Sequence, residues 1–160
     1  MAASADFLDI VNHPVKSRMF LLKKLPSAFF CGVRIRHAES GKAIVSVPYT
    51  WLTTNPFRST YFACLAMAAE MSTGILAMAH VYRKTPAISM LVVGLDSVYH
   101  KKAVGLTTFT CLDGNLFEDA IRIATDSGIP QSVSATSTGT NAANEKIATF
   151  KVTWSFRVRS

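Results

Sequence analysis

The sequence predicts an α+β domain in which an antiparallel sheet wraps around one long central helix, at about residues 59–82. Three observations lead to this prediction. The segment from Ser59 to Tyr82 is apolar, rich in Ala and Met, and holds a single acid, Glu70. Segments rich in strand-forming residues lie on both sides of it along the chain. The last of them alternates apolar and polar residues from Phe150 to Val158, which is typical of a half-buried strand.

The composition indicates one domain with a large core or a substantial subunit interface. The chain has 160 residues, of which 49% are hydrophobic and only 17% are charged. The net charge of +7 admits an anionic partner. The basic residues are scattered and match no nucleic-acid-binding motif, so we expect no nucleic acid as partner, whereas a small phosphorylated ligand fits the charge.

Cysteine usage and the chain start favour a cytoplasmic protein. The three cysteines are odd in number and lie among apolar residues. Neither they nor the four histidines have the spacing of metal ligands, so we expect no metal. The first residues do not resemble a secretory signal. The 59–82 segment approaches the length of a membrane span, but it carries Glu70 at its middle. We therefore expect a buried helix and no membrane span.

Residues 1–26 are predicted to be an N-terminal helical extension. Apolar residues recur at helical spacing over residues 5–24, and Pro14 breaks or restarts the helix. The remaining residues, 27–160, are predicted to form a single domain.

Strands and one small helix account for the rest of that domain. Pro56 disfavours helix at the residue before it, so the long helix is expected to begin near Ser59 or Thr60, either of which is a suitable cap. The other predicted elements are strands at 29–36 and 43–49 before the long helix, strands at 88–93 and 105–112 after it, a small inserted helix at 115–125, and strands at 132–140 and 150–158.

Glu70 is the candidate functional residue, because a carboxylate is seldom buried without a partner or a task. Apolar surroundings would raise its pKa, while an amide donor would lower it. Asn55, in the loop before the helix, is the natural donor. Two simpler interpretations stay open: Glu70 only bonds a backbone amide or a facing helix, and Asn55 is only a turn residue.

The order of elements, with Asn55 in a loop and an acid inside the long helix, resembles the hotdog fold of acyl-CoA thioesterases. The pattern Asn-Pro-Phe…Ala-Glu-Met-Ser-Thr-Gly-Ile-Leu is most similar to the PaaI-like subgroup, and within it to a branch catalogued as a domain of unknown function. The resemblance covers roughly residues 27–158. At the helix start the subgroup usually has His and Gly, where this chain has Tyr61 and Phe62.

The resemblance implies an acyl-CoA thioesterase that needs no cofactor beyond the CoA of its substrate. Thioester hydrolysis requires an activated water or a nucleophile, and donors for the oxyanion. The implied roles are Glu70 as base or nucleophile, the Phe62 amide as oxyanion donor beside Tyr61, Asn55 as the donor that orients a water or the carboxylate, Ser89 as the residue that holds the water, and Lys101, Lys102 and Arg157 as contacts to CoA phosphates. In the simpler interpretation, which stays open, Ser89 and Tyr61 have only structural roles and the three cations are only solvated.

The spacing of Phe62 and Glu70 predicts sites shared between chains. Eight residues of helix span about 12 Å, too far for one helix to bring both to one carbonyl. A two-fold dimer with antiparallel central helices solves this, with Asn55, Tyr61 and Phe62 of one chain facing Glu70 and Ser89 of the other. We expect a homodimer or a dimer of dimers.

Two other functions stay open. The bulk of Phe62, where the family has glycine, favours a non-catalytic hotdog module that binds acyl-CoA or an acyl chain. The positive charge leaves a nucleic-acid-associated protein as a third interpretation.

Overall fold

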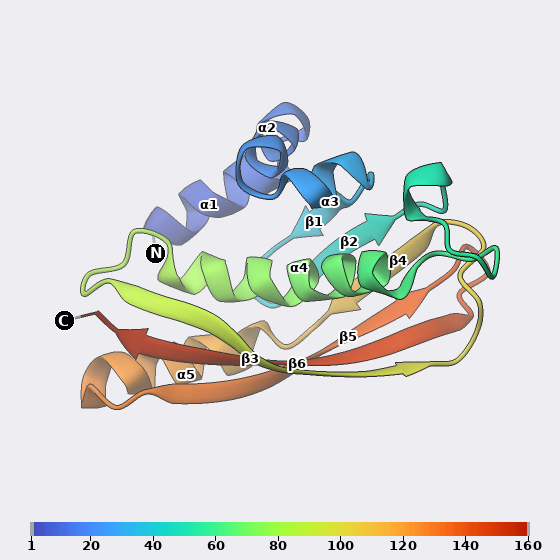
Figure 1. Cartoon of the computed structure of the whole chain (residues 1–160). Helices are drawn as coiled ribbons and strands as arrows, with labels where there is room; N and C mark the ends of the chain where they lie inside the picture. The colour runs from blue at the N-terminus through green and yellow to red at the C-terminus, as the bar shows by residue number, and fades with distance from the viewer. Residues whose placement is uncertain (1, 160) are drawn as a thin grey trace.

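The computed structural model describes residues 2–159 of the chain. Figure 1 shows three helices at the N-terminus, one long helix near the centre, and strands that lie beneath and behind it. The elements in chain order are α1 (Ala2–Asn12), α2 (Pro14–Lys24), α3 (Pro26–Phe30), β1 (Arg34–Ala38), β2 (Ala43–Val47), the 3-10 helix η1 (Trp51–Thr53), α4 (Phe62–Val81), β3 (Ile88–Tyr99), β4 (Thr107–Cys111), α5 (Gly114–Ser127), β5 (Gln131–Thr140) and β6 (Lys146–Val158).

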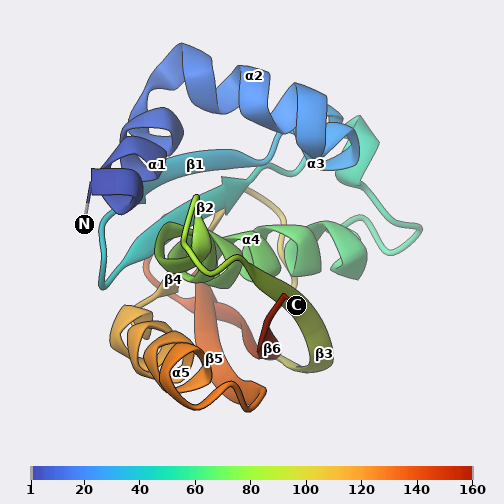
Figure 2. The same cartoon turned by 90° about the vertical axis from the view of Figure 1, so that its left-hand side faces the viewer.

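Six strands form one antiparallel sheet in the order β1-β2-β4-β5-β6-β3. The sheet curves around α4, as the view in Figure 2 shows, with α1 to α3 on one side of that helix. Helix α5 packs against α4 and against strands β5 and β6, where its Phe117 ring meets Phe156 edge to face. The predicted α+β architecture with one central helix is therefore confirmed. Strand β3 pairs only with β6, so its other side is a free edge of the sheet.

Helix α4 is the centre of the core because it is apolar on nearly every side. Ala68, Ala69, Leu76 and Ala77 are fully buried, and their small or branched side chains let the strands approach closely. Of the described helices, only α4 is long and apolar enough to cross a membrane by length and composition, and 61% of that stretch is buried inside the fold. Such burial is what a helix wrapped by a sheet requires.

The N-terminal helices belong to the same core. Phe7 and Val11 of α1 and Leu21 of α2 are buried at 2% exposure or less. The predicted restart at Pro14 is confirmed, because Pro14 is the first residue of α2 and His13 caps the helix through a hydrogen bond from the Val15 amide at 3.2 Å.

Several boundary predictions are wrong. Phe29 and Phe30 end helix α3 instead of beginning a strand, because Pro26 starts a helical turn and Gly32, at φ +77°, reverses the chain. The cap of α4 is Tyr61, not Ser59 or Thr60, and it has no side-chain cap bond. Strands β3 and β6 are also longer than predicted, since they pair continuously from Ile88 with Val158 to Tyr99 with Ala148, with one bulge after Val92.

Candidate active site

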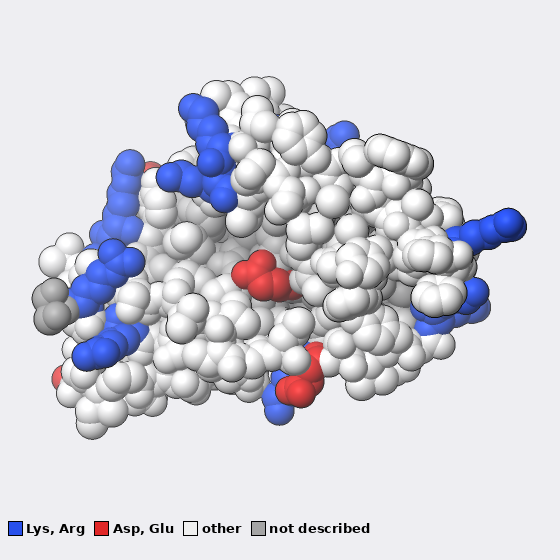
Figure 3. Space-filling model, in the orientation of Figure 1, with Lys and Arg blue, Asp and Glu red and all other residues white. Residues whose placement is uncertain are grey.

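Glu70 lies at the middle of α4, on a pocket of about 500 Å³. The pocket walls come from distant parts of the chain, including Phe20 and Lys24 of α2, Met90 of β3 and Trp154 of β6. Figure 3 shows acidic atoms in a hollow of a largely uncharged face over the middle of α4, and Glu70 is the only acid in that helix. A carboxyl group therefore stands in an open, apolar pocket.

Burial raises the pKa of Glu70 to about 7. No side chain or amide among residues 2–159 forms a hydrogen bond or ion pair with its carboxyl group that would offset this cost. Lys24 lines the same pocket but makes no ion pair with it. The group is thus poised to exchange a proton near neutral pH, and the simpler interpretation of a carboxylate bonded to a backbone amide does not apply within one described chain.

Gly74 makes room for this carboxyl group one helical turn further on. A Cβ atom at position 74 would lie 3.3 Å from Glu70 Oε1 and 3.2 Å from Trp154 Cζ2, closer than ordinary contact. A glycine inside a helix costs about 1 kcal/mol relative to alanine, so its use here marks a close approach. Sequence reasoning missed Gly74, although a glycine four residues after the acid was a visible signal.

A second pocket, of about 620 Å³, lies at the start of α4. It brings together the predicted residues Asn55, Tyr61, Phe62, Lys101 and Lys102, from the loop before α4 and the chain after β3. The rings of Tyr61 and Phe62 pack edge to face with centroids 4.9 Å apart. Both rings are exposed, so they form a wall of the pocket and leave it open.

Asn55 organises the loop before α4. Its Oδ1 accepts hydrogen bonds from the Phe57 amide at 3.0 Å, from the Ser59 amide at 3.2 Å and from Ser59 Oγ at 3.3 Å. Its Nδ2 makes one long bond, 3.5 Å, to the Thr60 carbonyl. The turn role is therefore real, and the amide nitrogen keeps donor capacity at the pocket wall.

The Phe62 amide is a free donor in the first turn of α4. No acceptor for this N–H lies within bonding distance among the described residues, whereas the amides of Cys64 and Leu65, two and three residues further on, bond to the Tyr61 carbonyl. First-turn amides lack intrahelical partners, and the helix dipole favours negative charge there. This donor meets the requirement for an oxyanion contact.

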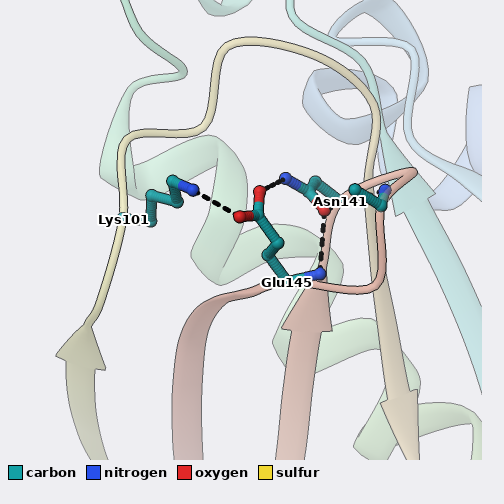
Figure 4. Close-up of polar contacts among 4 residues, drawn as sticks. Lys101, Asn141 and Glu145 are labelled. Carbon is teal, nitrogen blue, oxygen red and sulfur yellow. Dashed lines mark hydrogen bonds and ion pairs between the residues drawn. The ribbon is translucent and has the colours of Figure 1, made fainter.

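The two lysines of the second pocket are held differently. Lys101 Nζ bonds to Glu145 Oε1 at 2.6 Å, and Asn141 Nδ2 bonds to the other oxygen of that carboxylate at 2.7 Å (Figure 4). Lys102 Nζ has only a long bond of 3.4 Å, to the Phe57 carbonyl. Lys102 is therefore the freer cation for an anionic ligand.

Ser89 and Arg157 lie away from both pockets in the single chain. Ser89 Oγ donates to the Arg157 carbonyl at 3.1 Å across the paired strands. Ser89 neighbours Met90 in the strand, so its side chain points to the opposite face from the Glu70 pocket that Met90 lines. Ala148 of β6 pairs with Tyr99, close to Lys101 in the chain. Arg157 lies nine residues further along β6, so it is roughly 30 Å from the pocket that holds Lys101.

One chain does not unite the predicted residues, and the surface between the two pockets is unusual. Apart from His80 near its C-terminal end, the partly exposed residues of α4 form a single stripe that includes Ala63, Ala66, Glu70 and Gly74. Beside it, the free edge strand β3 exposes Leu91 and Val93, at 66% and 55%. A long apolar edge strand is a template for pairing with another chain.

Metal ligands do not gather near either pocket. Over residues 2–159, no group of three or more His, Cys, Asp or Glu side chains could hold a metal ion. Burial raises the pKa values of the Cys64 and Cys111 thiols to about 11, so both are poor nucleophiles.

Comparison with known proteins gives the fold. No family model and no curated protein sequence matches the chain. Among solved structures, a protein of unknown function from Pseudomonas aeruginosa superposes with a TM-score of 0.77 at 18% identity over 91% of this chain and 97% of that one.

Two further structures carry informative names. The E. coli PaaI protein, from the phenylacetic acid degradation operon, has a TM-score of 0.64 at 12% identity, with 94% of this chain and 97% of that one covered. A thioesterase from Haemophilus influenzae has a TM-score of 0.60 at 10% identity, with 89% and 90% covered. The chain therefore has the hotdog fold.

Proposed function

We propose that the protein is an acyl-CoA thioesterase whose active sites form between two chains. The single observation that carries this proposal is Glu70, an unpaired carboxyl group with a pKa of about 7 in an open apolar pocket. A group with that pKa exchanges protons efficiently at neutral pH, as a general base for water must. As a carboxylate it also has the chemistry of a nucleophile toward a thioester carbonyl.

The dimer is what brings the remaining groups to Glu70. A two-fold axis that passes α4 near Ala66, midway between Phe62 and Glu70, sets the partner's Phe62 amide beside Glu70. The same axis sets the Ser89 end of β3 alongside the Tyr99 end of the partner strand. Arg157 then approaches the pocket that holds the partner's Lys102. These two cations, roughly 30 Å apart in one chain, therefore contact one ligand in the proposed dimer.

In the proposed reaction, the Glu70 carboxylate takes a proton from a water as that water attacks the thioester carbonyl. The partner's Phe62 N–H and the amide dipoles of that helix start stabilise the oxyanion. Asn55 Nδ2 orients the water or the carboxylate. The C–S bond then breaks, and the thiolate of CoA takes up a proton.

The first experiment is hydrolysis of a panel of acyl-CoA thioesters by the intact chain and by Glu70→Gln, which keeps the shape and removes the charge. We expect turnover that falls at least 100-fold in Glu70→Gln. A matched control is Glu118→Gln, an acid on the separate helix α5. Binding of acyl-CoA without turnover by the unaltered chain contradicts hydrolysis.

Mixing two inactive variants tests the shared site. Phe62→Pro removes the N–H at the first helical position, where proline is well tolerated, while Glu70→Gln removes the carboxylate. Random mixing makes half of the dimers hybrid, and each hybrid holds one intact site, so about one quarter of full activity returns. No recovery after the subunits have exchanged contradicts sites formed between chains.

A non-catalytic hotdog module that binds acyl-CoA is the second candidate. It is favoured by the Phe62 side chain, which stands 55% exposed at the helix start where a thioester would approach the amide. Phe62→Gly separates the two: an enzyme keeps or gains turnover, and a module gains none.

A further inference from the structure

Helix α2 presents its apolar stripe to solvent instead of to the core. Val15, Met19 and Leu22 recur at the spacing of one helix face and are 60%, 50% and 45% exposed. The opposite face holds the buried Ser17 and Leu21. An outward-facing apolar stripe on a helix whose core face is already packed has no partner within the described chain.

Lys16 and Lys23 lie beside this stripe. Helix α2 has four basic residues, Lys16, Arg18, Lys23 and Lys24, and no acid. Residues 14–42 hold seven Lys or Arg and one Glu, so this segment carries a net +6 of the chain's +7. Figure 3 shows basic side chains beside uncharged atoms at the upper edge of the molecule, where Figure 1 places α2.

The shape of this surface favours a flat partner. Both ribbon views place α2 at the outer edge of the molecule, beyond α1. The apolar side chains thus stand on a convex ridge, whereas a helical or extended peptide partner is bound in a groove or at a strand edge. A second copy is disfavoured, because a two-fold contact would oppose two surfaces of the same positive charge.

We propose that the exposed face of α2 docks on an anionic lipid bilayer. Val15, Met19 and Leu22 enter the boundary between headgroups and acyl chains, as in helices that lie in the membrane interface. Lys16 and Lys23 extend beside them to lipid phosphates or carboxylates, with their methylene stems on the apolar surface. Phe20 and Lys24, which line the Glu70 pocket, lie on the other side of the same helix, so docking leaves that pocket uncovered. Docking does not depend on hydrolysis.

The test is co-sedimentation of the full chain with vesicles of phosphatidylcholine alone and with 30% phosphatidylserine. We expect binding only to the anionic vesicles, weakened by salt. Each lysine near an anionic surface changes affinity about fivefold, so Lys16→Glu with Lys23→Glu is expected to lower it more than 25-fold. Met19→Ser with Leu22→Ser is expected to lower it at least tenfold, since burial of apolar side chains is lost.

Matched controls separate docking from general charge. Lys146→Glu with Lys151→Glu makes the same change in net charge on exposed residues of β6, and Ile129→Ser removes an equally exposed apolar side chain elsewhere. We expect both to bind vesicles as the unaltered chain does, with unchanged thermal melts in all variants.

Three results would overturn the proposal. The first is equal loss of binding in the β6 control. The second is unchanged binding in Met19→Ser with Leu22→Ser. The third is no vesicle binding while soluble poly-glutamate is bound through α2, which would assign the face to an acidic protein.

Discussion

The indole Nε1 of Trp154 donates a hydrogen bond of 2.9 Å to Thr73 Oγ1, which ties strand β6 to the core of α4 beside the Glu70 pocket. The Thr73 hydroxyl in turn donates to the Glu70 carbonyl at 2.8 Å. The sheet, the helix and the backbone of the candidate catalytic residue are thus linked through two hydrogen bonds, one buried and one partly buried.

Trp154→Phe tests this link. Loss of the donor leaves a buried hydroxyl oxygen with one partner fewer, which costs about 1–3 kcal/mol of the free energy of unfolding, before any loss of packing. Urea unfolding measures the difference, and Trp51→Phe is the control because Trp51 is 85% exposed. Equal stability of the Trp154→Phe and Trp51→Phe proteins would show that the bond contributes nothing.

Glu70 makes stability depend on pH in a predictable direction. Its pKa rises from 4.5 to about 7 on folding, so the folded chain binds more protons than the unfolded chain between these pH values, and stability falls as pH rises through them. The full effect is about 3 kcal/mol at pH 8.

Glu70→Gln removes that cost. We expect the variant to be more stable than the unaltered chain at pH 8 and nearly equal to it at pH 4.5. Urea unfolding at both pH values measures this. A difference that does not change with pH would mean that Glu70 does not titrate in this range.

Activity is expected to rise with pH as Glu70 loses its proton, whereas stability falls. A base or nucleophile acts as the carboxylate, so kcat/KM should rise tenfold per pH unit below 7 and level off above it, given the Glu70 pKa of about 7. The profile is measured with the best substrate of the panel. A rate that falls as pH rises through 7 would make Glu70 a general acid instead.

The edge strand β3 supplies a test of assembly. Leu91→Lys with Val93→Lys places charges on the exposed apolar edge, and we expect the dimer to dissociate and turnover to be lost with it. Sedimentation velocity reports the change in mass. Ile129→Lys, at a residue 62% exposed far from β3 in the chain, serves as control. An intact dimer in the β3 variant would place the interface elsewhere.

Gly114 is predicted to be irreplaceable for packing. A Cβ there would collide with the Ser40 backbone carbonyl, whereas a Cβ at Gly105 meets nothing within 4 Å. We expect Gly114→Ala to cost about 1–3 kcal/mol of unfolding free energy and Gly105→Ala to be neutral, by urea unfolding. Equal stability of both variants would show that the β1–β2 turn yields freely.

The central helix and most strands were predictable because their patterns are local. An apolar run around Glu70 specifies a buried helix, and the alternation from Phe150 specifies a half-buried strand. The strand expected at Phe29 failed because two aromatic residues suggest a strand, while Pro26 and Gly32 impose a helical turn and a reversal.

The site was only partly predictable. Asn55, Tyr61, Phe62 and the two lysines gather at one helix start, which sequence proximity and the order of elements anticipate. The wall that α2 gives to the Glu70 pocket depends on how three N-terminal helices dock, and no local pattern encodes that docking.

The free edge of β3 also has a consequence for regulation. On the proposed dimer, pairing of the two edges and completion of the sites are one event, so active sites exist only at chain concentrations above the dissociation constant. Specific activity would then fall on dilution, and any ligand that spans both chains would restore it. The concentration of the protein would thereby control its own specific activity.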